Sequence, residues 1–374
     1  MSTIPFIDLK TQYRALKESI DSRIHKVLEH GAFVNGPEIT ELERALEKFT
    51  GAKHALACSN GTDALLVPLM ALGIGPGDEV ITTAFSFIAT AQVIVLAGAT
   101  PVYVDIDPKT FNMDVSKLEK AITPKTKAIM PVSLYGQMAD MDEINSIAQK
   151  HGLHVIEDAA QSFGATYKGV RSCASSNYAG TSFFPAKPLG CYGDGGAIFT
   201  NDSAMYTAMK EVREHGSERR YYHTRIGLNA RLDTLQCAIL LAKLERYPWE
   251  IEQRDRIGMA YNQAFNELAQ YGVHIPVVKS DRRSVWAQYT LRTANRDAFQ
   301  KKLTELGVPT SIHYPMMMPD QPAYKKMAGD TSHLGESRKA ALEVISLPMY
   351  PDMTDEVFHQ VVEKVRTAAL ATKG

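Results

Sequence analysis

Hydrophobic side chains follow a helical spacing at the start of the chain and change to short alternating runs from about residue 54 onward. The helical spacing predicts an amphipathic helix over residues 9–30, which Gly31 ends, and a second helix that begins at Pro37. From residue 54, short apolar runs typical of strands alternate with segments typical of helices. Such alternation favours a mainly parallel sheet with helices on both of its faces.

The expected strands of this sheet are short, and most are separated by helices. We expect strands at 54–58, 79–82, 100–104, 128–131, 154–157 and 195–200. We expect the helices at 63–72, 87–97, 141–151 and 204–215. No G-x-G-x-x-G motif opens a helix after a strand, which argues against a nicotinamide-binding site.

A long apolar helix at 232–244 separates this region from a C-terminal part with a different texture. The C-terminal part combines strand-like and helical segments, which lie at 285–292, 296–306, 310–313 and 354–369. The fold class is therefore α/β, with a large domain over residues 1–246 and a smaller α+β domain over residues 247–374. The length of 374 residues agrees with two domains.

The composition is ordinary for a soluble globular protein, with 45% hydrophobic and 22% charged residues. The formal net charge of −1 gives no global field that would attract nucleic acid or an acidic membrane, so we expect neither as a partner. The four cysteines form no C-x-x-C pair and no zinc pattern with histidine, so we expect no metal and reduced thiols in a cytoplasmic protein. The start, Met1–Pro5, shows no sign of a signal peptide.

Residues 59–63 read Ser-Asn-Gly-Thr-Asp where a buried strand gives way to a helix. Backbone N–H groups and the positive end of a helix favour an anion there, while Gly61 allows close approach and Thr62 adds a hydroxyl. The same residues also fit an ordinary strand–turn–helix corner with Asn60 or Thr62 as the cap. If the site holds a phosphate, we expect the backbone N–H of Asp63 to face it and the carboxylate of Asp63 to turn away.

Two further segments supply a carboxylate and a lysine. Asp158 follows the strand 154–157 at its carboxyl end, the edge where parallel sheets bind ligands, although it could also cap a helix. Gln161 could reach a ring hydroxyl or complete a capping box. Most lysines are surface groups, but Lys187 lies in a Gly-, Pro- and aromatic-rich loop that favours a neutral, Schiff-base-forming amine. A phosphate cradle, a carboxylate and a lysine together predict pyridoxal phosphate (PLP) as the cofactor.

These motifs closely resemble the DegT/DnrJ/EryC1/StrS family of sugar aminotransferases, and the likeness covers nearly the whole chain. The segments that carry it include Ser59–Thr62, Glu157–Gln161, Ser182–Lys187 and Gly227–Asp233. The resemblance implies the PLP-dependent transferase fold of type I, which is the fold of aspartate aminotransferase. Dehydratases of the family carry histidine where this chain has Lys187, so the lysine indicates a transaminase.

The resemblance also implies a role for each matching residue. Lys187 would bind PLP covalently, Asp158 would pair with its ring nitrogen and Gln161 with its ring hydroxyl. Phe87 and Ala160 would cover the two faces of the ring. The phosphate would be held by Gly61, Thr62, Asp63, Ser182 and, across a subunit interface, Asn229. A homodimer with active sites at that interface is therefore expected.

A basic stretch between Arg213 and Arg231 indicates an anionic substrate, although a solvated loop with surface ion pairs would have the same composition. Arg231 is the first candidate for a substrate contact, and His313 and Tyr314 follow. The run at 219–227 looks most like that of family members acting on UDP-2-acetamido-2-deoxy-3-oxo-D-glucuronate. This likeness implies amino transfer from L-glutamate to a nucleotide sugar for bacterial surface polysaccharide (O-antigen).

Two other functions stay open at this point. One is amino transfer to a 4-keto or dTDP-linked hexose on the same fold. The other, more remote, is a regulatory or binding protein that has lost catalysis, against which the complete set of Thr62, Asp158 and Lys187 argues. Many relatives carry histidine at the position of Ser133, and many read H-Y-P-x-P-L where the run 313–319 differs. Both departures concern the substrate rather than the cofactor.

Overall fold

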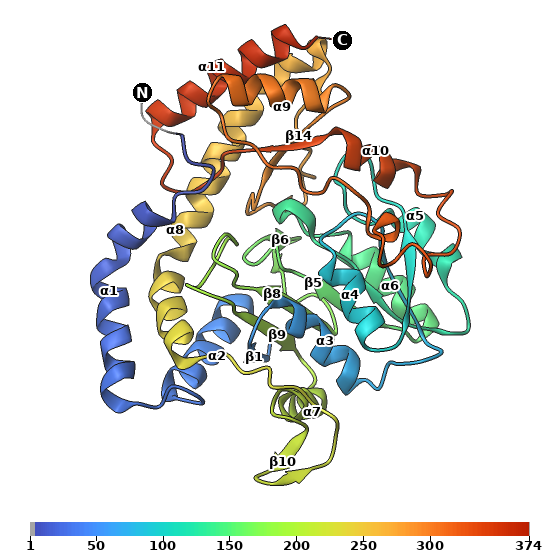
Figure 1. Cartoon of the computed structure of the whole chain (residues 1–374). Coiled ribbons are helices and arrows are strands. Elements are labelled where there is room, and N and C mark those ends of the chain that lie inside the picture. Colours follow the sequence, from blue (N-terminus) through green and yellow to red (C-terminus); the bar gives the residue numbers. More distant parts are fainter. Residues whose placement is uncertain (1–3, 374) are drawn as a thin grey trace.

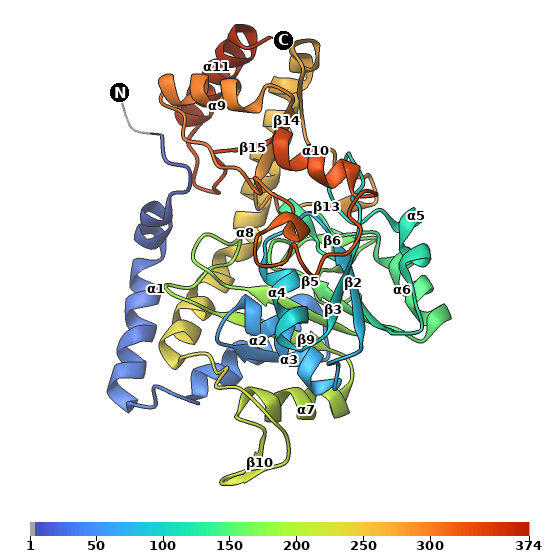
Figure 2. The ribbon, with the colours of Figure 1, turned by 45° about the vertical axis from the view of Figure 1, so that its right-hand side comes forward.

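The computed structural model describes residues 4–373 and shows a large α/β unit connected by one long helix to a smaller α+β unit (Figures 1 and 2). Part of the segment Met1–Pro5, on which no signal peptide is expected, lies outside the described residues. Every described helix is too short or too polar to cross a bilayer. The described residues contain no group of three or more His, Cys, Asp or Glu side chains that could hold a metal, and all four cysteines are buried as free thiols.

The large unit is built on a seven-stranded sheet with the order β1-β9-β8-β5-β4-β2-β3. The strands are β1 (His54–Cys58), β2 (Glu79–Thr83), β3 (Thr100–Val104), β4 (Thr126–Met130), β5 (His154–Asp158), β8 (Tyr178–Ser182) and β9 (Gly196–Thr200). Strand β9 runs opposite to the other six strands, which are parallel to one another, so the predicted mainly parallel sheet is confirmed. Strand β8 was not predicted, although it lies in the middle of the sheet.

Helices cover both faces of this sheet, because consecutive strand residues point to opposite sides. Val155 of β5 packs in one core and Ile156 in the other. The first core contains α2 (Pro37–Thr50) and α6 (Met141–His151). The second contains α3 (Gly61–Ala71), α4 (Ala89–Leu96) and α7 (Ser203–Arg213). A short helix, α5 (Val115–Leu118), lies beside α6.

Helix α8 (Thr234–Phe265) extends through both units, with α1 (Leu9–His30) packed along its first part (Figure 1). Its residues up to Ile251 belong to a core of the large unit, whereas Ile257 and later residues belong to the core of the small unit. The expected boundary between residues 246 and 247 therefore falls inside one continuous helix. The division into two domains stays a prediction.

The small unit contains a three-stranded antiparallel sheet covered by helices. Its elements are β12 (Val273–His274), β14 (Tyr289–Thr293), β15 (Val344–Leu347), α9 (Arg296–Glu305) and α11 (Asp355–Ala371). Helix α10 (Gly335–Glu343) precedes β15. The segment 310–313 forms no strand and has a single bridge, between Ser311 and Ser346, so that prediction is wrong. Within residues 4–373 there are also four short 3₁₀ helices: η1 (Glu119–Ala121), η2 (Leu134–Gly136), η3 (Asn266–Tyr271) and η4 (Met318–Asp320).

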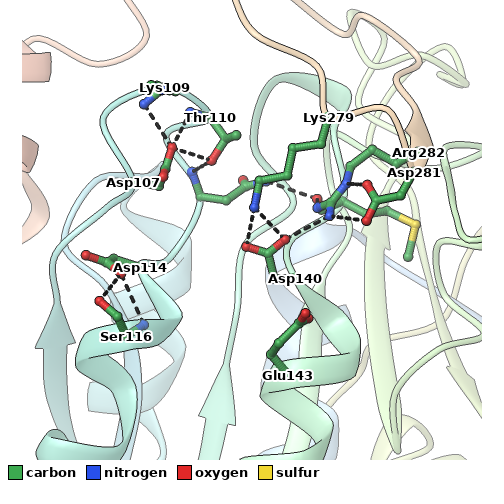
Figure 3. A network of polar contacts seen from close by, with 12 residues as sticks. Asp107, Lys109, Thr110, Asp114, Ser116, Asp140, Glu143, Lys279, Asp281 and Arg282 are labelled. Carbon is green, nitrogen blue, oxygen red and sulfur yellow. Dashed lines mark hydrogen bonds and ion pairs between the residues drawn. The ribbon is translucent and has the colours of Figure 1, made fainter.

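The C-terminal half also contacts the large unit through a small separate sheet. Strand β13 (Arg282–Arg283) pairs with the hairpin of β6 (Thr166–Tyr167) and β7 (Val170–Arg171). Figure 3 shows Asp140 between two cations from this half. Its carboxylate accepts hydrogen bonds of 2.8 Å from Lys279 Nζ and from Arg282 Nη2. These contacts hold the loop before α6 against the segment 277–283.

A two-stranded hairpin, β10 (Ser217–Arg219) and β11 (Tyr222–His223), projects from the body of the molecule beyond α7 (Figures 1 and 2). Large side chains around it are exposed to solvent, with Tyr221 83% and Ile226 86% accessible. Exposed apolar groups gathered on one projecting element are typical of a surface that contacts another protein chain.

Candidate active site

Asp158 lies at the carboxyl end of β5, between β4 and β8, and only 5% of it is exposed. Its Oδ2 accepts a 2.7 Å hydrogen bond from Thr90 Oγ1, and its Oδ1 accepts one of 3.2 Å from the backbone N–H of Ala160. Burial raises the pKa of Asp158, while these donors and the charge of Lys187 oppose that rise. The carboxylate is therefore held in place and gains stability from a cation beside it.

Lys187 lies in the loop that follows β8. This loop is fixed by backbone hydrogen bonds from Phe183 to Gly195, from Cys191 to Phe183 and from Lys187 to Phe184, each 2.7–2.8 Å long. Burial lowers the pKa of Lys187, and Asp158 opposes this effect. Because Asp158 pairs with Gly180 in the parallel register of β5 and β8, the end of β5 and the loop after β8 lie at the same edge of the sheet.

The predicted phosphate cradle lies at the start of α3. Asn60 caps the helix, since its Oδ1 accepts a 2.9 Å hydrogen bond from the backbone N–H of Asp63. The carboxylate of Asp63 turns to Asn60 and to the hydroxyl of Ser59. The prediction that this backbone N–H faces an anion is therefore wrong, because Asn60 uses it. The first two helical N–H groups, those of Gly61 and Thr62, have no partner within the helix and suit an anion.

Gly61 and Ser182 lie against each other, and this contact joins the cradle to the lysine loop. A β-carbon added to Gly61 would come within 2.5 Å of Ser182 Cβ, a distance that real side chains do not reach. Only glycine therefore allows the end of β8 to approach the helix start so closely. The backbone of Gly61 and the hydroxyls of Thr62 and Ser182 are thus available on one side of the site.

An aromatic ring stands exposed in the same region. Phe87 is 52% accessible, which is unusual for a large apolar side chain, and its ring centre lies 5.9 Å from that of Tyr314. Ala160, the predicted residue on the other ring face, is partly buried next to Asp158. An exposed aromatic beside a buried carboxylate offers a flat apolar surface to a planar ligand.

Gln161 connects three parts of the site. Its Oε1 accepts a 2.9 Å hydrogen bond from the backbone N–H of Tyr135, and its Nε2 donates one of 3.0 Å to Tyr314 Oη. His313 Nδ1 lies 2.9 Å from Ser346 Oγ. Burial and the charge of Lys187 lower the pKa of His313 to about 4, so its ring is neutral near pH 7.

The remaining two predicted residues flank Ala230, whose carbonyl oxygen accepts a 2.9 Å hydrogen bond from the backbone N–H of Ser59. Asn229 is exposed and its backbone forms an isolated bridge with Glu214. Arg231 Nη1 lies 3.5 Å from a carboxylate oxygen of Glu214. The structure of one chain therefore brings Lys187, Asp158 and Gln161 together and leaves Asn229 and Arg231 beside the projecting hairpin.

The roles of several residues of the site were not predicted from the sequence. Thr90 looks like an ordinary residue of the apolar helix α4, and nothing local marks it as a partner of Asp158. Tyr135 lies in a Leu-Tyr-Gly segment for which no role was predicted. Ser133, noted as a departure from the family, donates a 2.9 Å hydrogen bond to the buried carboxylate of Glu157.

The residues present fit PLP. The close approach of Gly61 to Ser182 brings the helix start and the end of β8 together, and the cradle offers N–H and hydroxyl donors to a phosphate. Asp158 is a buried carboxylate suited to a protonated ring nitrogen, and Phe87 presents an open aromatic face. Lys187 has an amine whose lowered pKa favours the neutral, nucleophilic form.

Comparison with known proteins gives the class of this enzyme. The family model described as "DegT/DnrJ/EryC1/StrS aminotransferase family" matches residues 14–366, and the chain belongs to this family. It is similar to the UDP-2-acetamido-2-deoxy-3-oxo-D-glucuronate aminotransferase of Pseudomonas aeruginosa, with 56% identity over 93% of this chain and 95% of that protein. The family resemblance predicted from the motifs is thereby confirmed.

Solved structures agree with this assignment. The structure of DesV from S. venezuelae in complex with a ketimine intermediate has a TM-score of 0.96 and 38% identity, and the match covers 99% of both chains. NtdA from Bacillus subtilis, with bound cofactor PMP, has a TM-score of 0.90 and 32% identity, over 99% of this chain and 85% of that one. The predicted type I fold is confirmed, and the chain is a PLP-dependent sugar aminotransferase.

Proposed function

We propose that this enzyme transfers an amino group from L-glutamate to UDP-2-acetamido-2-deoxy-3-oxo-D-glucuronate. The observation that carries this substrate is the 56% identity to the Pseudomonas aeruginosa enzyme named for it, over nearly the full length of both chains. The basic stretch around Arg231 supports it, because a diphosphate and a carboxylate both suit arginine. The product would serve bacterial surface polysaccharide such as O-antigen, and the reaction would take place in the cytoplasm.

The chain supplies the groups that this chemistry needs. When bound, PLP supplies an aldehyde for the amino nitrogen and a ring that withdraws electrons from the reacting carbon. The Nζ of Lys187, whose pKa is lowered by burial, can take a proton from the α-carbon of the donor and return one to the acceptor carbon. The carboxylate of Asp158, oriented by Thr90 and Ala160, would face the protonated ring nitrogen.

The role of Lys187 is tested by chemical trapping. Borohydride reduction of the yellow holoenzyme should attach the cofactor to the peptide that contains Lys187. Lys187→Ala should abolish turnover, whereas Lys168→Ala should not, since Lys168 forms a surface pair with Asp142. Full activity of Lys187→Ala would refute the assignment.

The substrate is tested by parallel assays with L-glutamate as donor and different acceptors. The 3-oxo glucuronate nucleotide should be turned over faster than a 4-keto or a dTDP-linked hexose. Turnover of a 4-keto sugar alone would contradict the proposed substrate while leaving the enzyme class intact. The same assay with other amino acids in place of L-glutamate tests the donor.

We further propose that the active enzyme is a homodimer in which Asn229 completes the phosphate site of the partner. Three observations support this: the hairpin projects, Ile226 and Tyr221 are exposed, and the side chain of Asn229 is open to solvent. Equal mixing of Lys187→Ala and Asn229→Ala subunits should restore activity, because half of the dimers are mixed and each has one intact site. About a quarter of the wild-type activity is expected. No gain above the two separate variants would contradict a shared site.

A further inference from the structure

Two consecutive hydrogen bonds cross the active site, from Tyr135 to Gln161 and from Gln161 to Tyr314. The donor of the first bond determines which atom donates in the second. The backbone N–H of Tyr135 donates to the Gln161 side chain over 2.9 Å. A backbone N–H can only donate, so the Gln161 atom facing it is the carbonyl oxygen. The other end of the amide is therefore the NH₂ group, which donates to Tyr314 Oη over 3.0 Å.

This direction determines what the Tyr314 hydroxyl can do. Since its oxygen accepts from Gln161, its own O–H remains available as a donor to a further group. The hydroxyl stays protonated because burial and the charge of Asp158 raise the pKa of Tyr314. The ring of Tyr314 lies beside the exposed Phe87, so this O–H is on the side of the site where a ligand is expected.

The first donor is held by segments from three parts of the chain. Tyr135 has a left-handed backbone conformation, with φ of 57°, which costs about 1 kcal/mol for a residue other than glycine. The residue before it is fixed by a 2.9 Å hydrogen bond from Leu134 N–H to Asn112 Oδ1. The residue after it is fixed by a 3.0 Å hydrogen bond from Val285 N–H to Gly136 O. The side chain of Tyr135 donates through its hydroxyl to His313 O.

We propose that the backbone N–H of Tyr135 and the amide of Gln161 are positioning groups that fix the direction of these two hydrogen bonds, so that Tyr314 donates a hydrogen bond to an acceptor oxygen of the bound ligand. This inference rests on the proposed function, which supplies two such ligands, the substrate and the cofactor. It predicts that reversing the donor and acceptor of the hydrogen bond between residue 161 and Tyr314 removes the Tyr314 donor from the ligand, while every side chain stays in place.

Gln161→Glu tests the direction with almost no change in shape. A carboxylate at this position accepts from Tyr135 as before but also accepts from Tyr314, so the Tyr314 O–H turns away from the ligand. A protonated carboxyl can again donate to Tyr314 and restores the original direction. The kcat/KM of the variant, divided by that of the wild type at each pH, should therefore rise as the pH falls.

Tyr314→Phe and the double variant supply the second measurement. Each single variant should lose about tenfold in kcat/KM at neutral pH, the upper end for one neutral hydrogen bond. In the Tyr314→Phe background, Gln161→Glu should cost less than it does alone, because the part of its effect that comes from loss of the Tyr314 donor is already present. Tyr135→Phe keeps the backbone N–H, so it should show no recovery at low pH.

Two readouts independent of turnover accompany these assays. Fluorescence titration of each apo-protein with PLP gives the cofactor affinity, and thermal unfolding gives the Tm. Weaker PLP binding by Tyr314→Phe would identify the acceptor as a cofactor oxygen, and an increase in KM alone would identify it as a substrate oxygen. A similar Tm for the variants and the wild type shows that the losses do not come from misfolding.

Fully additive losses, or a constant ratio to the wild type across pH, would overturn the inference. That failure is distinct from failure of the proposed function. If the proposed function is wrong, the wild-type enzyme itself does not turn over the nucleotide sugar with L-glutamate. If only the inference is wrong, the wild type is active and PLP binds, but the two variants behave independently.

Discussion

Thr90 Oγ1 donates a 2.7 Å hydrogen bond to Asp158 Oδ2, and so links the first turn of α4 to the carboxyl end of β5. Both residues are buried. Burial raises the pKa of Asp158, and the Thr90 hydroxyl is the largest of the contributions that lower it. Thr90 therefore helps to keep the carboxylate charged and aimed at the position where the ring nitrogen of PLP would lie.

Thr90→Val should weaken cofactor binding. The substitution keeps the shape of the side chain but removes the donor, so the pKa of Asp158 should rise and its carboxylate should become less well oriented. We expect a loss of about tenfold in PLP affinity, as for a hydrogen bond to a charged group. Titration of the apo-protein with PLP measures this loss. Thr90→Ser keeps the hydroxyl and is the control, and an equal loss in both variants would contradict the role.

Gly61→Ala should disturb the phosphate cradle. The new methyl group would come within 2.5 Å of Ser182 Cβ, so the helix start and the end of β8 must separate. We expect PLP affinity to fall at least about tenfold, in line with the cost of overpacking. Gly335 is the matched control because it also begins a helix, but its β-carbon would meet nothing within 4 Å. If Gly335→Ala weakened PLP binding equally, crowding at Ser182 would not be the cause.

His313 should make the stability of the protein depend on pH in the acid range. Its pKa is lowered from 6.5 to about 4, so the unfolded chain binds a proton between these values that the folded chain does not. The free energy of unfolding should therefore fall as the pH drops from 6.5 to 4, by at most about 3 kcal/mol from this residue. Urea unfolding at several pH values should show a smaller fall for His313→Asn. Equal falls in the variant and the wild type would exclude His313 as a source.

Asp140→Asn should lower the stability of the contact between the two halves. Asp140 accepts from Lys279 and from Arg282, whose side chain is only 2% exposed, whereas an amide would weaken both bonds. We expect a loss of about 1–2 kcal/mol in the free energy of unfolding. Asp142→Asn is the control, because Asp142 pairs with Lys168 at the surface and should cost less than about 1 kcal/mol. Equal losses in the free energy of unfolding would show that the Asp140 contact stabilises the protein no more than a surface ion pair does.

Most elements of the large unit could be predicted because their apolar spacing is regular. The helices at Leu9–His30 and Met141–His151 and the strands at His54–Cys58 and Thr100–Val104 have the predicted bounds. Strand β8 was missed because Ala, Gly and Ser, which are not enriched in strands, make up most of Tyr-Ala-Gly-Thr-Ser, and its position between β5 and β9 makes it a strand. Tertiary context, which a local pattern does not contain, decides such a segment.

The cofactor residues could be predicted only in part, because some are recognisable from their local sequence and others are not. Asp158 and Lys187 stand out locally, one at a strand end and the other in an unusual loop. Thr90 lies 68 positions from Asp158 in the chain and meets it only because α4 and β5 pack in the folded sheet. Tyr135 takes part through its backbone N–H, which no side-chain motif reveals. These partners follow from topology rather than from residue type.

Helix α8 places side chains in the hydrophobic cores of both units without interruption between Thr234 and Phe265. If one core unfolds, its part of α8 loses its packing. The helix must then either break in the middle or lose structure in the other core as well. Because α8 belongs to both cores, we expect the two units to unfold together on heating, unlike domains joined by a loop, and a calorimetric trace should show one peak rather than two.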